Sequence, residues 1–276
     1  MILVSGATGN AGGAVVRALI EVGEEVRALV RDAESSALPE GVEVVIGDLN
    51  KPETLEPHLG GVSAAFLLAG YDGLAETLAN MRSAGVGRVV LLSSSAAPGG
   101  DMSNAVARYH ILSERAVRDS GLAWTFIQPN SLMSNTLRWL PQLREGDVIH
   151  DAFGDVAVAM IDPADLAAVA VKALATEELE GQSLRLSGPE AIYPTDRVRV
   201  LSAALGRELR FAAWSNEQAR KEMSAAMPAA YVDAFFSFFV DGTIDETTVL
   251  PTVRRVLGRE PRSFEQWVAA NVDSFR

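Results

Sequence analysis

Short apolar runs alternate with helical stretches through the first half of the chain. Continuous apolar runs, rather than alternating ones, are typical of a parallel sheet covered on both faces. A helix is expected between the first two runs, from Gly12 to Glu21. Strands that alternate with helices predict a doubly wound α/β fold. The expected strands are Ile2–Ser5, Val26–Val30, Val42–Ile46, Ala64–Leu68, Val89–Ser93 and Trp124–Gln128.

The second half is less regular, and its last 60 or so residues are expected to be all helical. Pro163–Ala175 is expected to be a helix, with a proline in its first turn. Further strands are expected at Val156–Ile161, Ser183–Leu186 and Leu209–Ala212. We therefore expect a nucleotide-binding domain at 1–150, to which 156–187 returns, and a small, mostly helical lobe at 188–276.

Composition and charge narrow the functional classes. The 276 residues are 48% hydrophobic, which allows a sizeable core. A net charge of −12 argues against nucleic acid and anionic membranes as partners. The chain has no cysteine and no metal-binding motif, and it opens on MILVSG without a signal-like segment. No apolar run approaches the ~18 residues of a membrane span. We expect a soluble cytoplasmic protein without a metal.

A glycine-rich turn follows the first expected strand, with the spacing G-x-x-G-x-x-G. Gly6 permits a tight turn, Gly9 lets the backbone approach a pyrophosphate, and Gly12 or Gly13 lets the helix pack closely on the sheet. The turn predicts a bound dinucleotide, and the alternative is a tight turn without a ligand. The residues expected to contact the dinucleotide here are Gly6, Thr8, Gly9, Asn10, Ala11 and Gly12.

The end of the second strand bears on the choice of dinucleotide. Arg31 stands where an NAD site would place a carboxylate for the ribose 2′-hydroxyl. A guanidinium can pair with a 2′-phosphate, so NADP(H) is favoured over NAD(H). Because Asp32 follows directly, the signal is mixed, and Arg31 as a solvated surface residue is the alternative.

The ends of the next strands supply further candidates. Asp48 is expected to accept from the adenine amino group and Leu49 to pack on the ring, although a turn or helix cap explains Asp48 equally well. The small residues at 68–70 let the backbone approach the cofactor ribose. Ser93 ends the fifth strand, where it either binds the ligand or caps a turn. The cofactor candidates at these strand ends are Asp48, Leu49, Leu68, Ala69, Gly70 and Ser93.

Segments along nearly the whole chain, in order, resemble the NmrA-like branch of the atypical short-chain dehydrogenases. They read GATGNAGG, VRALVRD, GDLN, LLAG, SGLAWTFIQPN, MIDPADLAAVAVKAL, GQSLRLSGPEAI and GREPRSFEQWVAANVDSF. The resemblance implies a Rossmann-type doubly wound parallel sheet with a small C-terminal substrate lobe. It also implies either an NADPH-dependent reductase or a cofactor-binding regulator. Gln128-Pro129-Asn130 departs from the R-P-G that is frequent in the family, so no substrate contact is carried over there.

The segment RYHILSER contains the catalytic candidates. Read as Tyr-x-x-x-Lys from Tyr109, it has Ser113 in place of the lysine. His110 lies eleven residues before Gly121, the register where the resemblance places a lysine in isoflavone-reductase relatives and a histidine in the quinone-reductase-like branch. His110 or Tyr109 is therefore expected to supply a proton as hydride arrives, with Glu114 in position to orient the imidazole. The alternatives are packing roles for both rings and a solvated His110–Glu114 pair.

The richest aromatic stretch spans residues 231–240, and its apolar side chains recur at helical spacing. Three interpretations stay open: core packing, the apolar wall of a pocket for a flat aromatic substrate, and a homodimer surface. Trp214, Met223 and Met227 suit an adaptable pocket.

The function expected first is an NAD(P)H-dependent oxidoreductase for a quinone or another conjugated aromatic carbonyl. The second is a redox sensor that binds NADP(H) without turnover. A third is a cofactor-independent or oxygen-using role on the same scaffold.

Overall fold

The computed structural model describes residues 1–32 and 38–276, which divide into two compact units. Unit 1 comprises 1–100, 107–129 and 163–185, and unit 2 comprises 101–106, 130–162 and 186–276. The expected boundary at 150 differs from this division, since the chain enters unit 2 directly after the sixth strand. Side chains from 133–149 pack in the core of unit 2, which explains the difference. The chain returns to unit 1 at 163–185, within the segment 156–187 expected to return.

Unit 1 is built on one sheet. Within the described residues it has seven strands in the order β3-β2-β1-β4-β5-β6-β8, and the pairs from β3 through β6 are parallel. The doubly wound α/β fold is thereby confirmed. The strands are β1 (Ile2–Ser5), β2 (Val26–Val30), β3 (Glu43–Ile46), β4 (Ala64–Leu68), β5 (Arg88–Leu92), β6 (Ala123–Pro129) and β8 (Gln182–Leu186).

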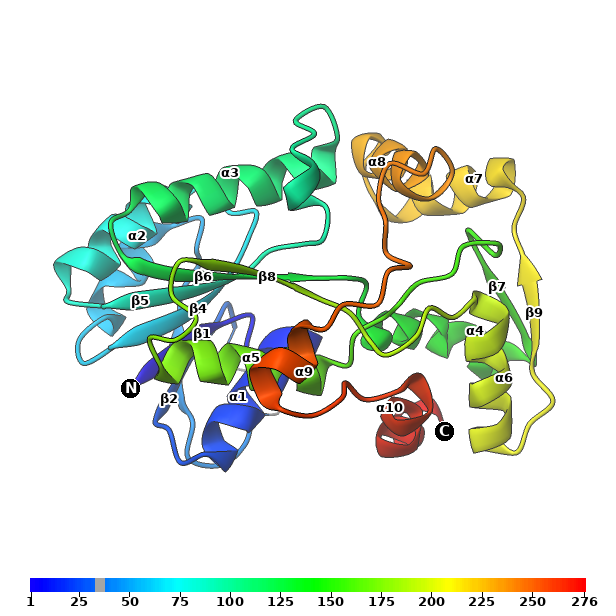
Figure 1. The fold of residues 1–276 in the computed structure, drawn as a ribbon, viewed down its shortest axis with the longest axis horizontal. Helices are drawn as coiled ribbons and strands as arrows, with labels where there is room; N and C mark the ends of the chain where they lie inside the picture. Colours follow the sequence, from blue (N-terminus) through cyan, green and yellow to red (C-terminus); the bar gives the residue numbers. More distant parts are fainter. Residues whose placement is uncertain (33–37) are drawn as a thin grey trace. The chain divides into compact units, whose positions relative to one another are not determined.

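Helices cover both faces of this sheet, with α2 and α3 on one face and α1 and α5 on the other (Figure 1). The two helices of the second pair pack against each other. Continuous apolar strands fit this arrangement because neither face of the central strands meets water. The helices are α1 (Asn10–Glu21), α2 (Leu74–Ser83), α3 (Ala105–Asp119) and α5 (Pro163–Ala175), and short 3₁₀ turns lie at Pro52–Thr54, Glu56–His58 and Ala97–Gly99.

The turn between β1 and α1 is shaped by two glycines. Gly6 has φ +63°, a conformation that favours glycine. A Cβ on Gly12 would lie 2.2 Å from the carbonyl oxygen of Gly6, so the helix begins in backbone contact with the end of the strand. The adjacent β4 is tied to this corner by the Leu68 amide, which donates to Ser5 Oγ at 3.0 Å. The expected roles of Gly6 and Gly12 in the turn are confirmed.

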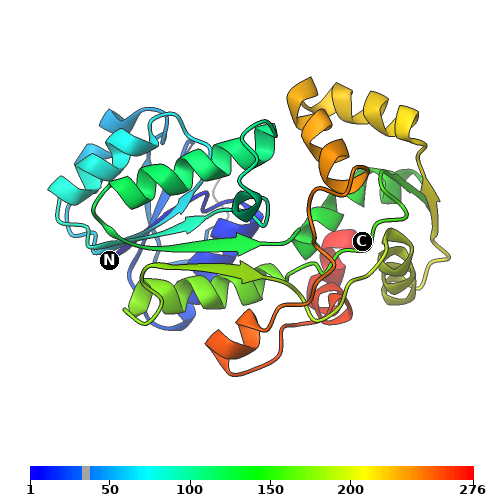
Figure 2. The ribbon, with the colours of Figure 1, turned by 45° about the horizontal axis from the view of Figure 1, so that its top comes forward.

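Unit 2 is mostly helical, and α7 and α8 contact each other as consecutive helices (Figure 2). Within the described part of the unit, two short strands pair in parallel. Its larger core gathers Trp139, Leu201, Phe264 and Trp267 with other apolar side chains. The elements are β7 (Val148–Asp151), β9 (Arg210–Ala213), α4 (Leu140–Glu145), α6 (Pro194–Leu205), α7 (Asn216–Ala226), α8 (Ala229–Phe239), α9 (Thr252–Leu257), α10 (Phe264–Asn271) and 3₁₀ helices Met133–Trp139 and Val272–Phe275.

The strand expected at Val156–Ile161 is wrong. Its backbone bonds to three separate segments instead of one neighbouring strand. Val158 exchanges bonds with Ile192, the Ala159 amide donates to the carbonyl of Glu246, and the Ile161 amide donates to that of Ser131. The apolar run is therefore buried without forming a ladder.

Among the described residues, no helix has the length and apolar character needed to cross a membrane.

Gly12→Ala is expected to lower the free energy of unfolding by about 1–3 kcal/mol, because the added methyl group would collide with rigid backbone. Thermal or urea unfolding measures the loss. Gly60→Ala is the matched control, since a Cβ there meets no described atom within 4 Å. Equal stability of the two variants would contradict the close packing described for α1.

Candidate functional site

The glycine turn presents backbone at the carboxyl edge of the unit 1 sheet. Thr8, Gly9 and Asn10 are exposed, while Ala11 and Gly12 are buried against the sheet. Gly9 is the N-cap of α1 and provides no side chain to bond its first amides. A helix N-terminus in this state can receive a phosphate anion. The residues present therefore fit the pyrophosphate of a dinucleotide.

The second and third strands end at the same edge. Arg31 is exposed directly after β2, as a residue that reaches a ribose phosphate would be. Asp48 Oδ1 accepts the Asn50 amide at 2.9 Å, so this carboxylate forms a turn. Leu49 is 3% exposed within the core cluster of unit 1. Its side chain is accounted for by core packing, which leaves its backbone as the part available to a cofactor.

The end of β4 brings cofactor candidates and catalytic candidates together. Gly70 has φ +94°, and its amide donates to Ser113 Oγ at 3.0 Å. A Cβ on Gly70 would stand 3.1 Å from Cδ2 of Tyr109, so this ring packs directly on the glycine. Leu68 and Ala69 are half-buried beside it. The structure thus places α3 with Tyr109 against the strand end that was expected to approach the ribose.

Tyr109 and His110 form a ring pair, with centroids 4.1 Å apart and planes 36° apart. His110 is buried at 9% exposure, and burial lowers its pKa to about 4. Its Nδ1 is buried without a hydrogen-bond partner in the described chain. At neutral pH the imidazole is therefore uncharged, and it can donate a hydrogen bond but is a weak source of a proton.

Glu114 was expected to orient His110, with a solvated pair as the alternative. The structure shows neither arrangement. Glu114 is buried at 4% exposure, and its Oε1 accepts from Ser93 Oγ at 2.6 Å and from Gln128 Nε2 at 2.7 Å. Its other oxygen pairs with Arg118 at 3.1 Å. The network ties α3 to β5 and β6. The Ser93 hydroxyl is therefore occupied by this network. Gln128, which stands where the family often has arginine, has a structural role in it.

Unit 2 contains a cavity of about 410 Å³, a volume typical of small-molecule sites. Phe235 and Phe239 of α8 line it together with Trp214, Met223 and Met227. Of the three interpretations of the aromatic stretch, the pocket wall therefore applies to these two rings. Other members of that stretch, Val232 and Phe236, belong instead to a small core cluster.

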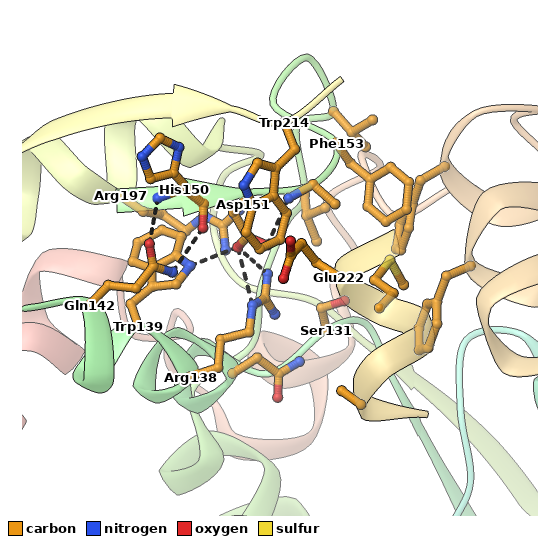
Figure 3. Close-up of a pocket in the computed structure, with 18 of the residues that line it drawn as sticks. Ser131, Arg138, Trp139, Gln142, His150, Asp151, Phe153, Arg197, Trp214 and Glu222 are labelled. Atoms are coloured by element: carbon orange, nitrogen blue, oxygen red, sulfur yellow. Dashed lines mark hydrogen bonds and ion pairs between the residues drawn. The ribbon is translucent and has the colours of Figure 1, made fainter. Parts of the chain in front are cut away.

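One side of this cavity is polar (Figure 3). Asp151 Oδ2 accepts from Arg138 Nε at 3.1 Å and Nη2 at 2.6 Å, and from Trp139 Nε1 at 2.7 Å. Its Oδ1 accepts the amide of Ala152 at 2.8 Å. Arg197 also lines the cavity, with its guanidinium carbon 5.1 Å from the centre of the Trp139 ring.

None of these polar residues was predicted from the sequence, although the position of Arg197 gave a signal there. In the helix 194–205, Arg197 lies on the same face as Val198 and Leu201, which are both core residues. A charge on an apolar helix face is a departure from amphipathic patterning. Arg138 and Asp151 had no comparable signal, because their pairing depends on the fold.

No group of three or more histidine, cysteine, aspartate or glutamate side chains in the described chain is placed to hold a metal ion.

A doubly wound sheet with a glycine turn at its carboxyl edge defines a dinucleotide-binding α/β protein. A family model described as NAD(P)H-binding matches residues 6–177, so the chain belongs to the NAD(P)H-binding family. The resemblance to NmrA-like short-chain reductases is confirmed, and NAD(P)H is the family's cofactor.

Two curated relatives span this chain completely and 99% of their own lengths. One is the (4-alkanoyl-5-oxo-2,5-dihydrofuran-3-yl)methyl phosphate reductase of Streptomyces griseus subsp. griseus, at 39% identity. The other is the NAD(P)H azoreductase of Xenophilus azovorans, at 35% identity. A solved Escherichia coli NADPH-dependent quinone oxidoreductase is 23% identical with a TM-score of 0.80, covering 99% of this chain and 100% of that one. The last likeness establishes the fold.

Acidification is expected to destabilise the protein through His110. The imidazole has a pKa of about 4 when folded, against roughly 6.5 when unfolded, so the unfolded chain binds the proton first. The free energy of unfolding should therefore fall as pH drops from about 6.5 to 4, by up to roughly 3 kcal/mol. His110→Gln removes this contribution, which urea unfolding at several pH values measures. His150→Gln, at an exposed histidine, is the control. An unchanged pH profile in His110→Gln would contradict the burial effect.

Proposed function

We propose that this protein is an NAD(P)H-dependent oxidoreductase that reduces a quinone or another conjugated aromatic acceptor. The observation that carries the proposal is the packing of Tyr109 on Gly70, with the His110 ring tilted against the tyrosine ring. This packing puts two hydrogen-bonding rings at the strand end nearest the expected cofactor ribose. A cofactor-binding turn alone would support a sensor equally well.

The cofactor is held by the edge of the unit 1 sheet. The amides of the glycine turn bind its pyrophosphate, and the backbone at 68–70 borders its ribose. Arg31 binds the 2′-phosphate, which gives NADPH its advantage over NADH. The bound nicotinamide supplies the hydride.

Tyr109 and His110 divide the handling of the proton. An acceptor oxygen gains negative charge as the hydride arrives, and a nearby donor lowers the barrier. Because burial keeps the His110 imidazole neutral, we assign it a hydrogen bond to this oxygen and assign the proton to the Tyr109 hydroxyl. The bond from Ser113 Oγ to the Tyr109 carbonyl, at 2.8 Å, helps to hold this turn of α3.

The acceptor occupies the cavity of unit 2. Its aromatic and methionine wall suits a flat conjugated ring, and methionine adapts to acceptors of different shape. The full-length relatives are named for a dihydrofuran methyl phosphate and for azo compounds, and a more distant one for quinone. These names share reduction of a conjugated acceptor, which supports the substrate class proposed.

A panel of quinones and azo dyes is expected to be reduced with oxidation of NADPH. Tyr109→Phe keeps the ring on Gly70 and should lower kcat about 10²–10⁴-fold, because only the acid is lost. His110→Gln should lower kcat less, with the affinity for NADPH retained in both variants. Absorbance of the nicotinamide measures turnover and calorimetry measures binding. NADPH binding without turnover of any acceptor would instead establish the sensor.

Arg31→Ala is expected to weaken NADPH binding about 10–100-fold and to leave NADH binding nearly unchanged, because only NADPH carries the 2′-phosphate. Calorimetry with each cofactor measures the two affinities. An equal loss for NADPH and NADH would remove Arg31 from the specificity for the phosphate. Arg17→Ala, at an exposed arginine of α1, is the control for a general loss of positive charge.

A further inference from the structure

Arg197 is a buried charged side chain that has a ring contact with Trp139 but no hydrogen-bonded or ion-paired partner among the described residues. It is 5% exposed in the wall of the unit 2 cavity, and its Nε is buried without a hydrogen bond. No ion pair of its guanidinium is found with any described residue. Burying an unpaired charge is costly, so an anionic ligand that paired with Arg197 would offset this cost.

The nearby carboxylate does not serve as the partner of Arg197. Asp151 is occupied by the two-bond pair with Arg138, the indole of Trp139 and one backbone amide. Burial lowers the pKa of Arg197 to about 10, and the charge of Arg138 lowers it while that of Asp151 raises it. Arg197 therefore remains a cation at neutral pH. The Arg138–Asp151 pair is balanced in itself, so it does not neutralise the charge of Arg197.

Glu222 is the remaining carboxylate of the cavity lining. Its Oε1 accepts from Gln218 Nε2 at 2.5 Å, within α7, and not from Arg197. Figure 3 shows Glu222, Arg138 and Arg197 around the same cavity. Because Glu222 adds a negative charge to the wall, the cavity suits a ligand with a single anionic group better than one with several.

The opposite wall is apolar and includes a strained residue. Phe153 has φ +56°, which is rare for a large side chain and marks functional positions in many proteins. Its ring packs on Phe236 at 5.3 Å and on Phe239 at 5.2 Å between centroids. The cavity thus combines a flat apolar wall with a buried cation.

We propose that this cavity selects acceptors that carry one oxyanion, a carboxylate or a phosphate ester, and that Arg197 binds this group. The conjugated ring lies against Phe153 and Phe239 while the oxyanion replaces the missing partner of the guanidinium. The inference rests on the proposal that the acceptor occupies this cavity. It adds the chemical group by which the acceptor is chosen.

Calorimetry with matched ligands tests this inference without turnover. 1-Naphthoate and 1-naphthamide have the same ring and nearly the same shape but differ in charge, and 1-naphthyl phosphate tests the second oxyanion. At least one of the two anions is expected to bind wild-type protein about 10–100-fold more tightly than the amide. Added salt should weaken binding of the anion and leave binding of the amide unchanged. The tighter anion identifies the group that the site prefers.

Three variants locate the effect. Arg197→Met, which keeps the volume and removes the charge, should abolish the preference for the anion and raise the unfolding temperature, because a buried unpaired charge is lost. Arg199→Met is the matched control on the same helix, since Arg199 is 73% exposed and pairs with Asp196. It should keep the preference. Glu222→Gln should tighten binding of the anion about 2–5-fold, since a repelling charge is removed.

Equal affinity of the amide and both anions for the wild-type protein would overturn the inference, and so would a preference that persists in Arg197→Met. If Arg197→Met does not fold, the salt dependence and Glu222→Gln decide in its place, because both are measured in protein that retains Arg197. These outcomes are separate from the proposed reductase activity. Selective binding of an anion without NADPH oxidation would refute the activity and retain the site.

Discussion

The contact on which unit 1 depends is the approach of Gly12 to the carbonyl of Gly6, where no Cβ fits. This contact starts α1 directly at the end of β1, so the amides of the helix open onto the carboxyl edge of the sheet. The strands that precede the cofactor candidates all end at that edge, because the central strands are parallel. A side chain at position 12 would move the helix away and take the phosphate site with it.

The packing of α3 has a similar role for the chemistry. The buried carboxylate of Glu114 ties the helix to Ser93 and Gln128, and the Gly70 amide binds Ser113. These bonds fix the helix turn that carries Tyr109 and His110. Burial then removes the charge of His110, which is why the proposed mechanism assigns the proton to Tyr109.

Much of unit 1 was predictable because local signals and the fold agree there. Continuous apolar runs and the glycine spacing identified the strands, the turn and α1. Residue-level roles were less predictable. Two partners of Glu114, Ser93 directly after β5 and Gln128 on β6, are far from it in the sequence, and only packing brings them together. In unit 2 the backbone of residues 156–161 forms hydrogen bonds with three separate segments instead of one strand. An apolar run in the sequence does not reveal which segments will pair with it. Arg197 was the exception, because its place on an apolar helix face was visible in the sequence.

A crystal structure with NADPH bound is the sharpest test of the proposed cofactor site. We expect the pyrophosphate against the amides of the turn at residues 8–12, the 2′-phosphate at Arg31, and the nicotinamide beside Tyr109 and His110. A nicotinamide remote from both rings would contradict the reductase mechanism. A pyrophosphate bound away from the glycine turn would contradict the account of the cofactor site itself.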